Sequence, residues 1–154
     1  MTKYSTRNFL LRQIVAADSH NLYELSKKAE FKNQSSAILG KGLNENRDLA
    51  HAYENNKKDF PIAKLVICKD TGEIIGAVVA QSCQDALSLS ILVSNSDQFA
   101  EVFVHFANEI KNMKEYKKIY IAPTLRNINE MFYFLSKANI ALEGENNPEF
   151  TITL

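Results

Sequence analysis

Cysteine is scarce in this chain of 154 residues, and no spacing of cysteine or histidine suggests a metal site. Cys68 and Cys83 are the only cysteines, they do not form a C-x-x-C motif, and no histidine lies close to either in sequence. Zinc sites and small disulfide-stapled folds need such clusters. The sequence therefore predicts neither a metal centre nor a disulfide framework.

An excess of charge of one sign is also missing. Eighteen basic residues balance eighteen acidic ones, and the sequence pI is near 6.8. Nucleic-acid-binding domains usually carry a basic excess or a basic stripe. Lysine pairs such as Lys57-Lys58 lie beside acidic or polar neighbours instead. We therefore expect no nucleic-acid partner.

Long apolar runs are absent as well. No segment approaches the roughly 20 apolar residues that span a bilayer, and the first residues lack the apolar core of a secretion signal. We expect a cytoplasmic protein without a membrane partner. A hydrophobic fraction of 45% is ordinary for a globular domain, and no repeat or linker divides the chain. The prediction is one domain over residues 1–154.

The first third of the chain predicts one strand and two helical stretches. Residues 9–15 are rich in apolar and β-branched types, which favour a strand, and Asp18 or Ser19 offers an N-cap for a short amphipathic helix. A second helical stretch is expected from Ser35 or Ser36 to about Tyr53. Glycines near its start also allow two shorter helices.

The middle of the chain predicts an antiparallel meander. Strands are expected over residues 62–68, 74–81 and 87–93, with turns at 70–72 and 84–85. Gly72 supplies the positive φ of a tight turn, and the third strand alternates apolar and polar residues, as a half-buried strand does.

The last third predicts a helix, a strand, a helix and a strand. Apolar residues at helical spacing indicate a long helix from about residue 99 to 113, a short strand follows at 119–122, and a helix runs from Asn127 or Ile128 to Asn139. A terminal strand at 150–154 is expected to pair with residues 140–142. The fold class is α/β (α+β), a mixed sheet with an antiparallel meander flanked by helices.

This order resembles the GNAT (N-acetyltransferase) superfamily over nearly the whole chain. Residues 11–18 are similar to the family's opening strand, and residues 70–78 are similar to its x-G-x-x-v-G-x-x hairpin. Asn127, followed by Tyr133 and Phe134, is similar to the family's N-x-x-a-x-x-F-Y helix. The resemblance implies a GNAT-like mixed sheet, an amine acceptor bound beneath the helices between residues 18 and 56, and acetyl-CoA or another acyl-CoA as cofactor.

The resemblance also implies a cofactor-binding segment at the start of the long helix. In the family, a Q/R-x-x-G-x-G/A motif begins about five residues after the preceding strand and holds the acyl-CoA pyrophosphate on backbone N–H groups. Gln98 fits the start of this motif, but Glu101 and Phe103 occupy its glycine positions. The implied cofactor-binding residues are Leu92, Val93, Ser94, Gln98, Phe99, Ala100, Glu101, Val102, Phe103 and Asn127.

Three consequences are expected from the missing glycines. A phenylalanine at position 103 would obstruct the approach of the phosphates. A glutamate at position 101 would repel them, by roughly 4 kcal/mol per charge pair at 4 Å and an effective dielectric constant of 20. Asn95 and Gln98 could also form a capping box, with Asp97 complementing the helix dipole, and so use the same amide groups.

Candidate catalytic groups are few. Ser88 and Ser90 are expected to point inward from the third meander strand, but hydroxyls are poor general bases. The family's general acid is a tyrosine on the last helix, and counting from Asn127 puts Phe134 at that position. A shift of one residue would make Tyr133 the general acid; otherwise it is a core or cleft aromatic.

Three hypotheses follow for function. The first is an acyl-CoA-dependent N-acyltransferase that acts on a small amine or a peptide amine and is able to form a homodimer. The oxyanion would be held by a backbone N–H near Leu92 or Val93. The second is a catalytically inactive GNAT-like module that binds a protein partner or another ligand. The third is a small α+β binding domain unrelated to that family.

Overall fold

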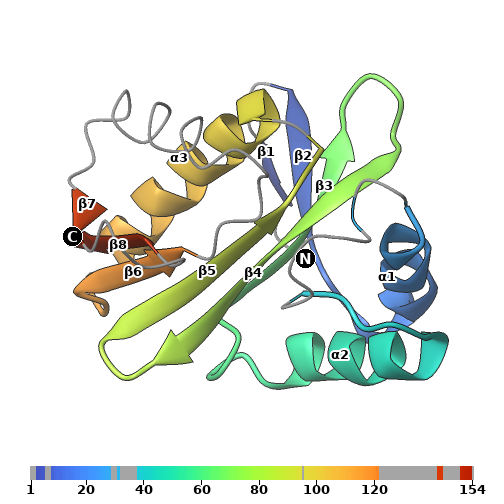
Figure 1. Ribbon diagram of the computed structural model, residues 1–154, viewed down its shortest axis with the longest axis horizontal. Coiled ribbons are helices and arrows are strands. Elements are labelled where there is room, and N and C mark those ends of the chain that lie inside the picture. The colour runs from blue at the N-terminus through green and yellow to red at the C-terminus, as the bar shows by residue number, and fades with distance from the viewer. Residues whose placement is uncertain are drawn as a thin grey trace.

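A single twisted sheet carries the described helices on its two faces. The computed structural model describes residues 3–5, 8–28, 31, 38–94, 96–121, 142–143 and 150–153. The eight described strands lie in the order β1-β2-β3-β4-β5-β6-β8-β7. Only β5 and β6 run parallel among these pairs. α3 lies on one side of the long β4–β5 ribbon, and α1 and α2 lie on the other (Figure 1).

The N-terminal part forms a hairpin followed by a short helix. Strand β1 (Lys3–Ser5) pairs with β2 (Phe9–Gln13), and a 3-10 turn, η1 (Ala16–Asp18), leads into α1 (Ser19–Ser26). The predicted strand and helix are confirmed. The edge strand β1 was not predicted, because three residues are too few to show an alternating pattern.

Helix α2 (Leu43–Asn55) begins later than expected. Residues 38–40 are not helical, and the buried Asn46 side chain holds this segment against the helix. Its Oδ1 accepts from the Gly40 N–H at 2.9 Å, and its Nδ2 donates to the carbonyls of Gly40 and Gly42. The prediction of one helix from Ser35 or Ser36 through residue 53 is therefore wrong, because these polar bonds fix a non-helical approach.

The predicted meander is confirmed. Strands β3 (Ile62–Cys68), β4 (Ile74–Cys83) and β5 (Ala86–Leu92) pair antiparallel in sequence order. Both turns contain a residue with positive φ. Gly72 has φ 72°, and Gln84 has φ 58°.

The described residues of the C-terminal part add one helix and three short strands. Helix α3 (Ser96–Met113) is followed by β6 (Lys118–Ile121), β7 (Leu142–Glu143) and β8 (Phe150–Thr153). The expected pairing of the terminal strand is confirmed at Leu142, which lies opposite Ile152. The helix predicted over residues 127–139 lies outside the described residues.

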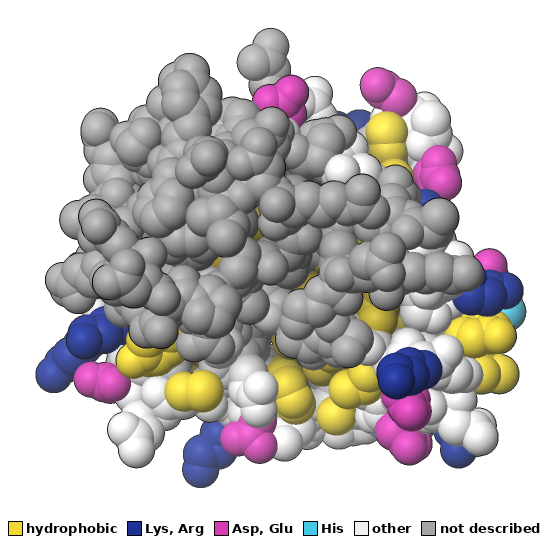
Figure 2. Space-filling model, in the orientation of Figure 1, with side chains coloured by type: hydrophobic (Ala, Val, Ile, Leu, Met, Phe, Trp, Pro, Cys, Tyr) yellow, Lys and Arg dark blue, Asp and Glu magenta, His cyan; other side chains and the backbone are white. Residues whose placement is uncertain are grey.

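Two apolar clusters cover the two faces of the sheet. α3 packs its apolar stripe on one face, against residues from β2 to β6. α1 and α2 pack on the other face, against residues of β3, β4 and β5. No described helix is long and apolar enough to cross a membrane. Figure 2 shows acidic and basic side chains interspersed around the visible described surface.

Candidate functional site

The junction between β5 and α3 is short and places a helix N-terminus at the end of a central strand. β5 ends at Leu92 and α3 begins at Ser96, so three residues connect them. The first N–H groups of a helix have no partner within the helix, and the helix dipole favours an anion there. The junction therefore has the backbone donors and the dipole direction that can hold a phosphate group.

Gln98 already uses one amide of this junction. It is the third residue of α3, and its Oε1 accepts a hydrogen bond from the Ser94 N–H at 3.1 Å. This contact resembles half of the predicted capping box, but it uses the amide of Ser94 instead of that of Asn95. Asn95 itself lies outside the described residues.

The predicted cofactor loop from Gln98 to Phe103 is helical instead. These residues form part of the first two turns of α3. The physical reason is the apolar stripe, since Phe99 and Val102 are fully buried against the sheet. Burial of residues at this spacing stabilises a helix that starts before them.

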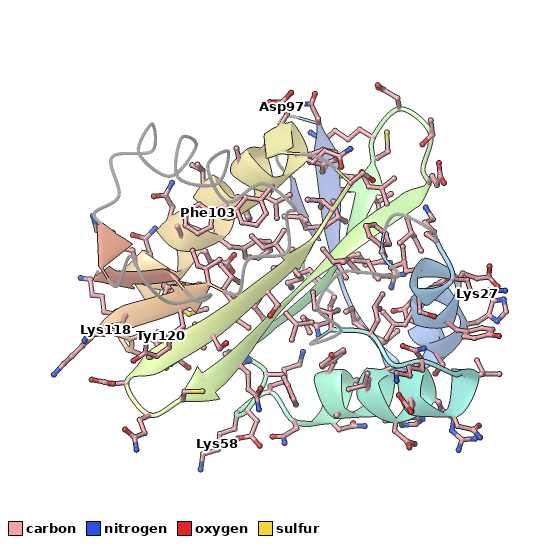
Figure 3. All side chains as sticks on the ribbon, in the orientation of Figure 1. Lys27, Lys58, Asp97, Phe103, Lys118 and Tyr120 are labelled. Carbon is pink, nitrogen blue, oxygen red and sulfur yellow. The ribbon has the colours of Figure 1, made fainter. Side chains whose placement is uncertain are left out.

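The two side chains expected to obstruct phosphates are directed elsewhere. The Glu101 carboxylate accepts from the Asn8 N–H at 2.8 Å and from Asn8 Nδ2 at 2.9 Å, which fastens α3 to the β1–β2 turn. Phe103 is 1% exposed, and its ring stacks on that of Phe99 with centroids 6.0 Å apart. The predicted steric block by Phe103 is therefore wrong. The acidic side chain of the first turn is Asp97, which lies exposed at the start of α3 (Figure 3).

β5 runs past the end of its pairing with β6. The two strands pair in parallel from Ala86 to Leu89, opposite Lys118 to Ile121. β5 then continues to Leu92, paired with β4 on its other side. β5 is thus paired with β6 only over its first four residues. The junction with α3 lies at the other end of β5.

Three side chains with hydroxyl groups, from β5 and β6, lie on the α1–α2 face of the sheet. Ser88 is half-buried and Ser90 is 7% exposed. Both alternate with residues that contact α3, so they lie on the same face of β5. Tyr120 of β6 pairs with Ser88 and also alternates with α3-facing residues, Ile119 and Ile121. Sequence analysis missed Tyr120, although that alternation was readable.

Solved structures of other proteins share this arrangement of strands and helices. No protein-family model matches the sequence, and no curated protein matches it either. A GNAT-family acetyltransferase from Bacillus anthracis matches with a TM-score of 0.67 and 13% identity over 99% of this chain and 98% of its own. A putative ribosomal-protein-serine acetyltransferase from Vibrio cholerae matches with a TM-score of 0.70 and 13% identity over 99% and 97%. An aminoglycoside acetyltransferase in complex with coenzyme A matches with a TM-score of 0.66 and 15% identity over 93% of both chains.

The chain has the GNAT fold. At these identities the likeness concerns the fold alone. The likeness counts against the third hypothesis, a small α+β binding domain unrelated to the family. Within this GNAT fold, four of the predicted cofactor-binding residues, Leu92, Val93, Ser94 and Gln98, meet at the β5–α3 junction. Asn127 and Tyr133 lie outside the described residues.

A partly buried ion pair fixes the other side of the GNAT fold, where β2 meets α1. Asp18 accepts from Arg12 Nη2 at 2.7 Å and Nη1 at 3.0 Å, from the Val15 N–H at 2.8 Å and from Asn21 Nδ2 at 2.9 Å. Burial favours the neutral acid, but the bonds from Arg12, Val15 and Asn21 outweigh burial and lower the pKa of Asp18. Among the described residues, no group of three or more His, Cys, Asp and Glu side chains could hold a metal ion.

Proposed function

We propose that this chain is an acyl-CoA-dependent N-acyltransferase that acts on a small amine or a peptide amine. The observation that carries the proposal is the β5–α3 junction, where a helix N-terminus follows a central strand of a GNAT fold. Solved structures with the same fold include an aminoglycoside acetyltransferase with coenzyme A and one with acetyl-CoA. The proposal transfers that class of ligand to this chain.

The proposed acyl-CoA site uses backbone groups more than side chains. The amides that open α3 would hold the pyrophosphate, and the end of β5 at Leu92 and Val93 would bind the arm that carries the thioester. Gln98 would release the Ser94 N–H when the phosphates bind. The buried residues Phe99, Val102 and Phe103 would hold the helix in position from the core, while Ala100 and Asn127 stay proposed contacts.

The proposed reaction is direct transfer. The unprotonated amine attacks the thioester carbonyl, the C–N bond forms, and a backbone N–H near Leu92 or Val93 binds the oxyanion. The C–S bond then breaks, the nitrogen loses its proton to solvent, and the departing thiolate takes a proton from Tyr133 or from water. Much of the rate would come from holding amine and thioester in line, which does not need a strong base.

The proposed acceptor is an amine because related folds act on amines. Solved neighbours include aminoglycoside acetyltransferases with ribostamycin and with kanamycin. In this chain, the acceptor would lie on the α1–α2 face, near Ser88, Ser90 and Tyr120. These hydroxyl groups can hydrogen-bond to an amine or to neighbouring polar groups of the acceptor.

Release of the CoA thiol tests this function. The wild-type chain is incubated with acetyl-CoA and, in separate reactions, with an aminoglycoside, a small polyamine and a peptide with a free N-terminus. Thiol release that depends on both chain and amine, with an acetylated amine found by mass spectrometry, is the expected result. Release at the rate of the buffer control with every amine would contradict the proposal for these acceptor classes.

A second candidate, a GNAT-fold module without catalysis, is favoured by one feature of the junction. Gln98 occupies the Ser94 amide, and Asp97 puts a negative charge in the turn that would face a phosphate. If this reading holds, acetyl-CoA will neither bind nor release thiol. The chain would then bind a protein partner or a different ligand.

A further inference from the structure

We infer that Gly76 is a positioning residue that sets the direction of the Leu92–Val93 peptide, which makes the Val93 N–H the donor to the acyl carbonyl. This inference rests on the proposed acyltransferase function. It chooses between the two amides that sequence analysis left open, and it assigns a role to a glycine on a neighbouring strand.

The absence of a side chain at Gly76 allows a close contact between β4 and the end of β5. Gly76 is buried on β4, next to Ala77, which forms the last β4–β5 pair with Leu92. A Cβ added at Gly76 would overlap the Leu92 carbonyl oxygen and would lie 3.0 Å from Val93 Cγ1. Gly76 does not have a positive φ, unlike Gly72, so a glycine is needed here for space and not for backbone conformation.

The position of the Leu92 oxygen determines where the next amide points. The Leu92 C=O and the Val93 N–H belong to one planar peptide unit, which is trans, so they point in opposite directions. Because the oxygen lies toward β4, the Val93 N–H points away from β4. The neighbour of β5 on that side is β6, whose pairing with β5 stops at Leu89. The Val93 amide is therefore directed to the side where β5 extends beyond β6.

The surroundings of Val93 would strengthen such a hydrogen bond. Val93 is 0% exposed and packs in the α3-side cluster. In a site that excludes water, a fixed N–H stabilises a developing oxyanion more than it would in solvent. The same burial means that the acyl group reaches this amide only when the atoms that cover it move aside.

Gly76→Ala tests the positioning role, with Gly42→Ala as the matched control. A Cβ at Gly42 would meet nothing within 4 Å. At a temperature where both variants are folded by circular dichroism, we expect Gly76→Ala to lower kcat at least about tenfold, since losing one oxyanion donor costs on the order of a hundredfold or more. KM for acyl-CoA should change less than kcat, because the phosphate contacts lie on α3. Gly42→Ala should keep the wild-type kcat. Wild-type kcat in Gly76→Ala would overturn the inference.

Amide chemical shifts of the wild-type chain test the donor without any variant. Coenzyme A and acetyl-CoA differ only at the sulfur, which carries a hydrogen in coenzyme A and an acetyl group in acetyl-CoA. We expect the Val93 amide proton to shift further with acetyl-CoA than with coenzyme A, and the Leu92 amide to respond equally to both. Equal shifts at Val93, or a difference at Leu92 instead, would overturn the assignment. If the wild-type chain is active but the Gly76→Ala or Val93 result is not as expected, only the inference about Gly76 and Val93 is wrong. If the wild-type chain binds neither ligand, the proposed acyltransferase function is wrong.

Discussion

Asp18 is the residue whose side chain makes the most polar contacts described in this protein. Its carboxylate is 5% exposed and accepts from Arg12, from Asn21 and from the Val15 backbone. Asp18→Ala would leave the Arg12 guanidinium without this partner and the Val15 amide without its acceptor. Because the Arg12 side chain is 22% exposed, the cost should be less than for a fully buried pair, about 1–3 kcal/mol. Urea unfolding of the variant at pH 7 should show a loss of that size.

The same pair predicts a dependence of stability on acidity. The pKa of Asp18 is lower in the folded chain than the ordinary value of 3.8. Its contribution to stability is therefore complete above pH 3.8 and is lost as pH falls through the lower folded value. The difference in unfolding free energy between wild type and Asp18→Ala should narrow below about pH 4. A constant difference down to pH 2 would show that the carboxylate charge does not matter.

Phe103 and Glu101 do not have the positions that alignment with the family's phosphate-binding motif predicted for them. Sequence analysis predicted that Phe103 would obstruct a bound phosphate and that Glu101 would repel it. In the structure, Phe103 is a core residue and Glu101 holds Asn8. Phe103→Gly should therefore destabilise the fold by at least the roughly 3–5 kcal/mol of a Phe→Ala change in a core. Thermal unfolding with and without acetyl-CoA checks this, and a variant that keeps wild-type stability and gains affinity would reinstate the earlier view.

At the level of elements, a hydroxyl group of α2 forms a buried hydrogen bond with the segment that precedes the helix. Tyr53 is 1% exposed and donates to the Ile38 carbonyl at 2.7 Å. Tyr53→Phe removes this bond and leaves a buried carbonyl without it, which costs about 1–3 kcal/mol. Denaturant unfolding should show this loss, while Tyr23→Phe, on half-buried α1 surface, should cost less than 1 kcal/mol. Equal effects would mean that the hydroxyl does not hold the segment.

The first turn of α3 is the element that decides affinity for phosphate. Asp97 is exposed there, so its repulsion of a bound pyrophosphate is screened and worth about 1 kcal/mol or less. Asp97→Asn should tighten acetyl-CoA binding roughly two- to fivefold by calorimetry, a factor of the size that this energy gives. Asp85→Asn, at the opposite end of β5, makes the same change in net charge and is the control. If both variants bind equally, the charge near α3 has no specific effect.

Elements with a strong local signal were predictable, and elements fixed by polar contacts were not. The three meander strands and their turns follow from alternation and turn residues, so their order and pairing could be predicted. The start of α2 depends on the Asn46 side chain, which bonds to Gly40 and Gly42. That contact is not visible as a local pattern before the chain is folded. The apolar stripe of α3 was visible from Phe99 onward, but residues 96–98 are polar, so the first turn of the helix was not predicted.

At the scale of the whole molecule, the order of the elements predicted the correct fold class, but it did not identify all the residues of the candidate site. The succession of a strand, helices, a meander, a helix and a parallel strand implied a GNAT-like sheet, and solved structures share it over nearly the full length. Site chemistry depends on which side chains converge. The face on which Tyr120 lies was readable from alternation, but its place beside Ser88 and the place of Gly76 beside Leu92 come only from pairing between strands.

We propose above all that this GNAT-fold chain binds acyl-CoA at the β5–α3 junction, although residues 93–103 contain no glycine. Thermal unfolding of the wild-type chain in increasing acetyl-CoA, and then in longer acyl-CoAs, tests it most directly. A ligand that binds only the folded state raises the melting temperature as its concentration exceeds Kd. We predict a saturating rise with at least one acyl-CoA. No rise with any of them at millimolar concentration would contradict the claim.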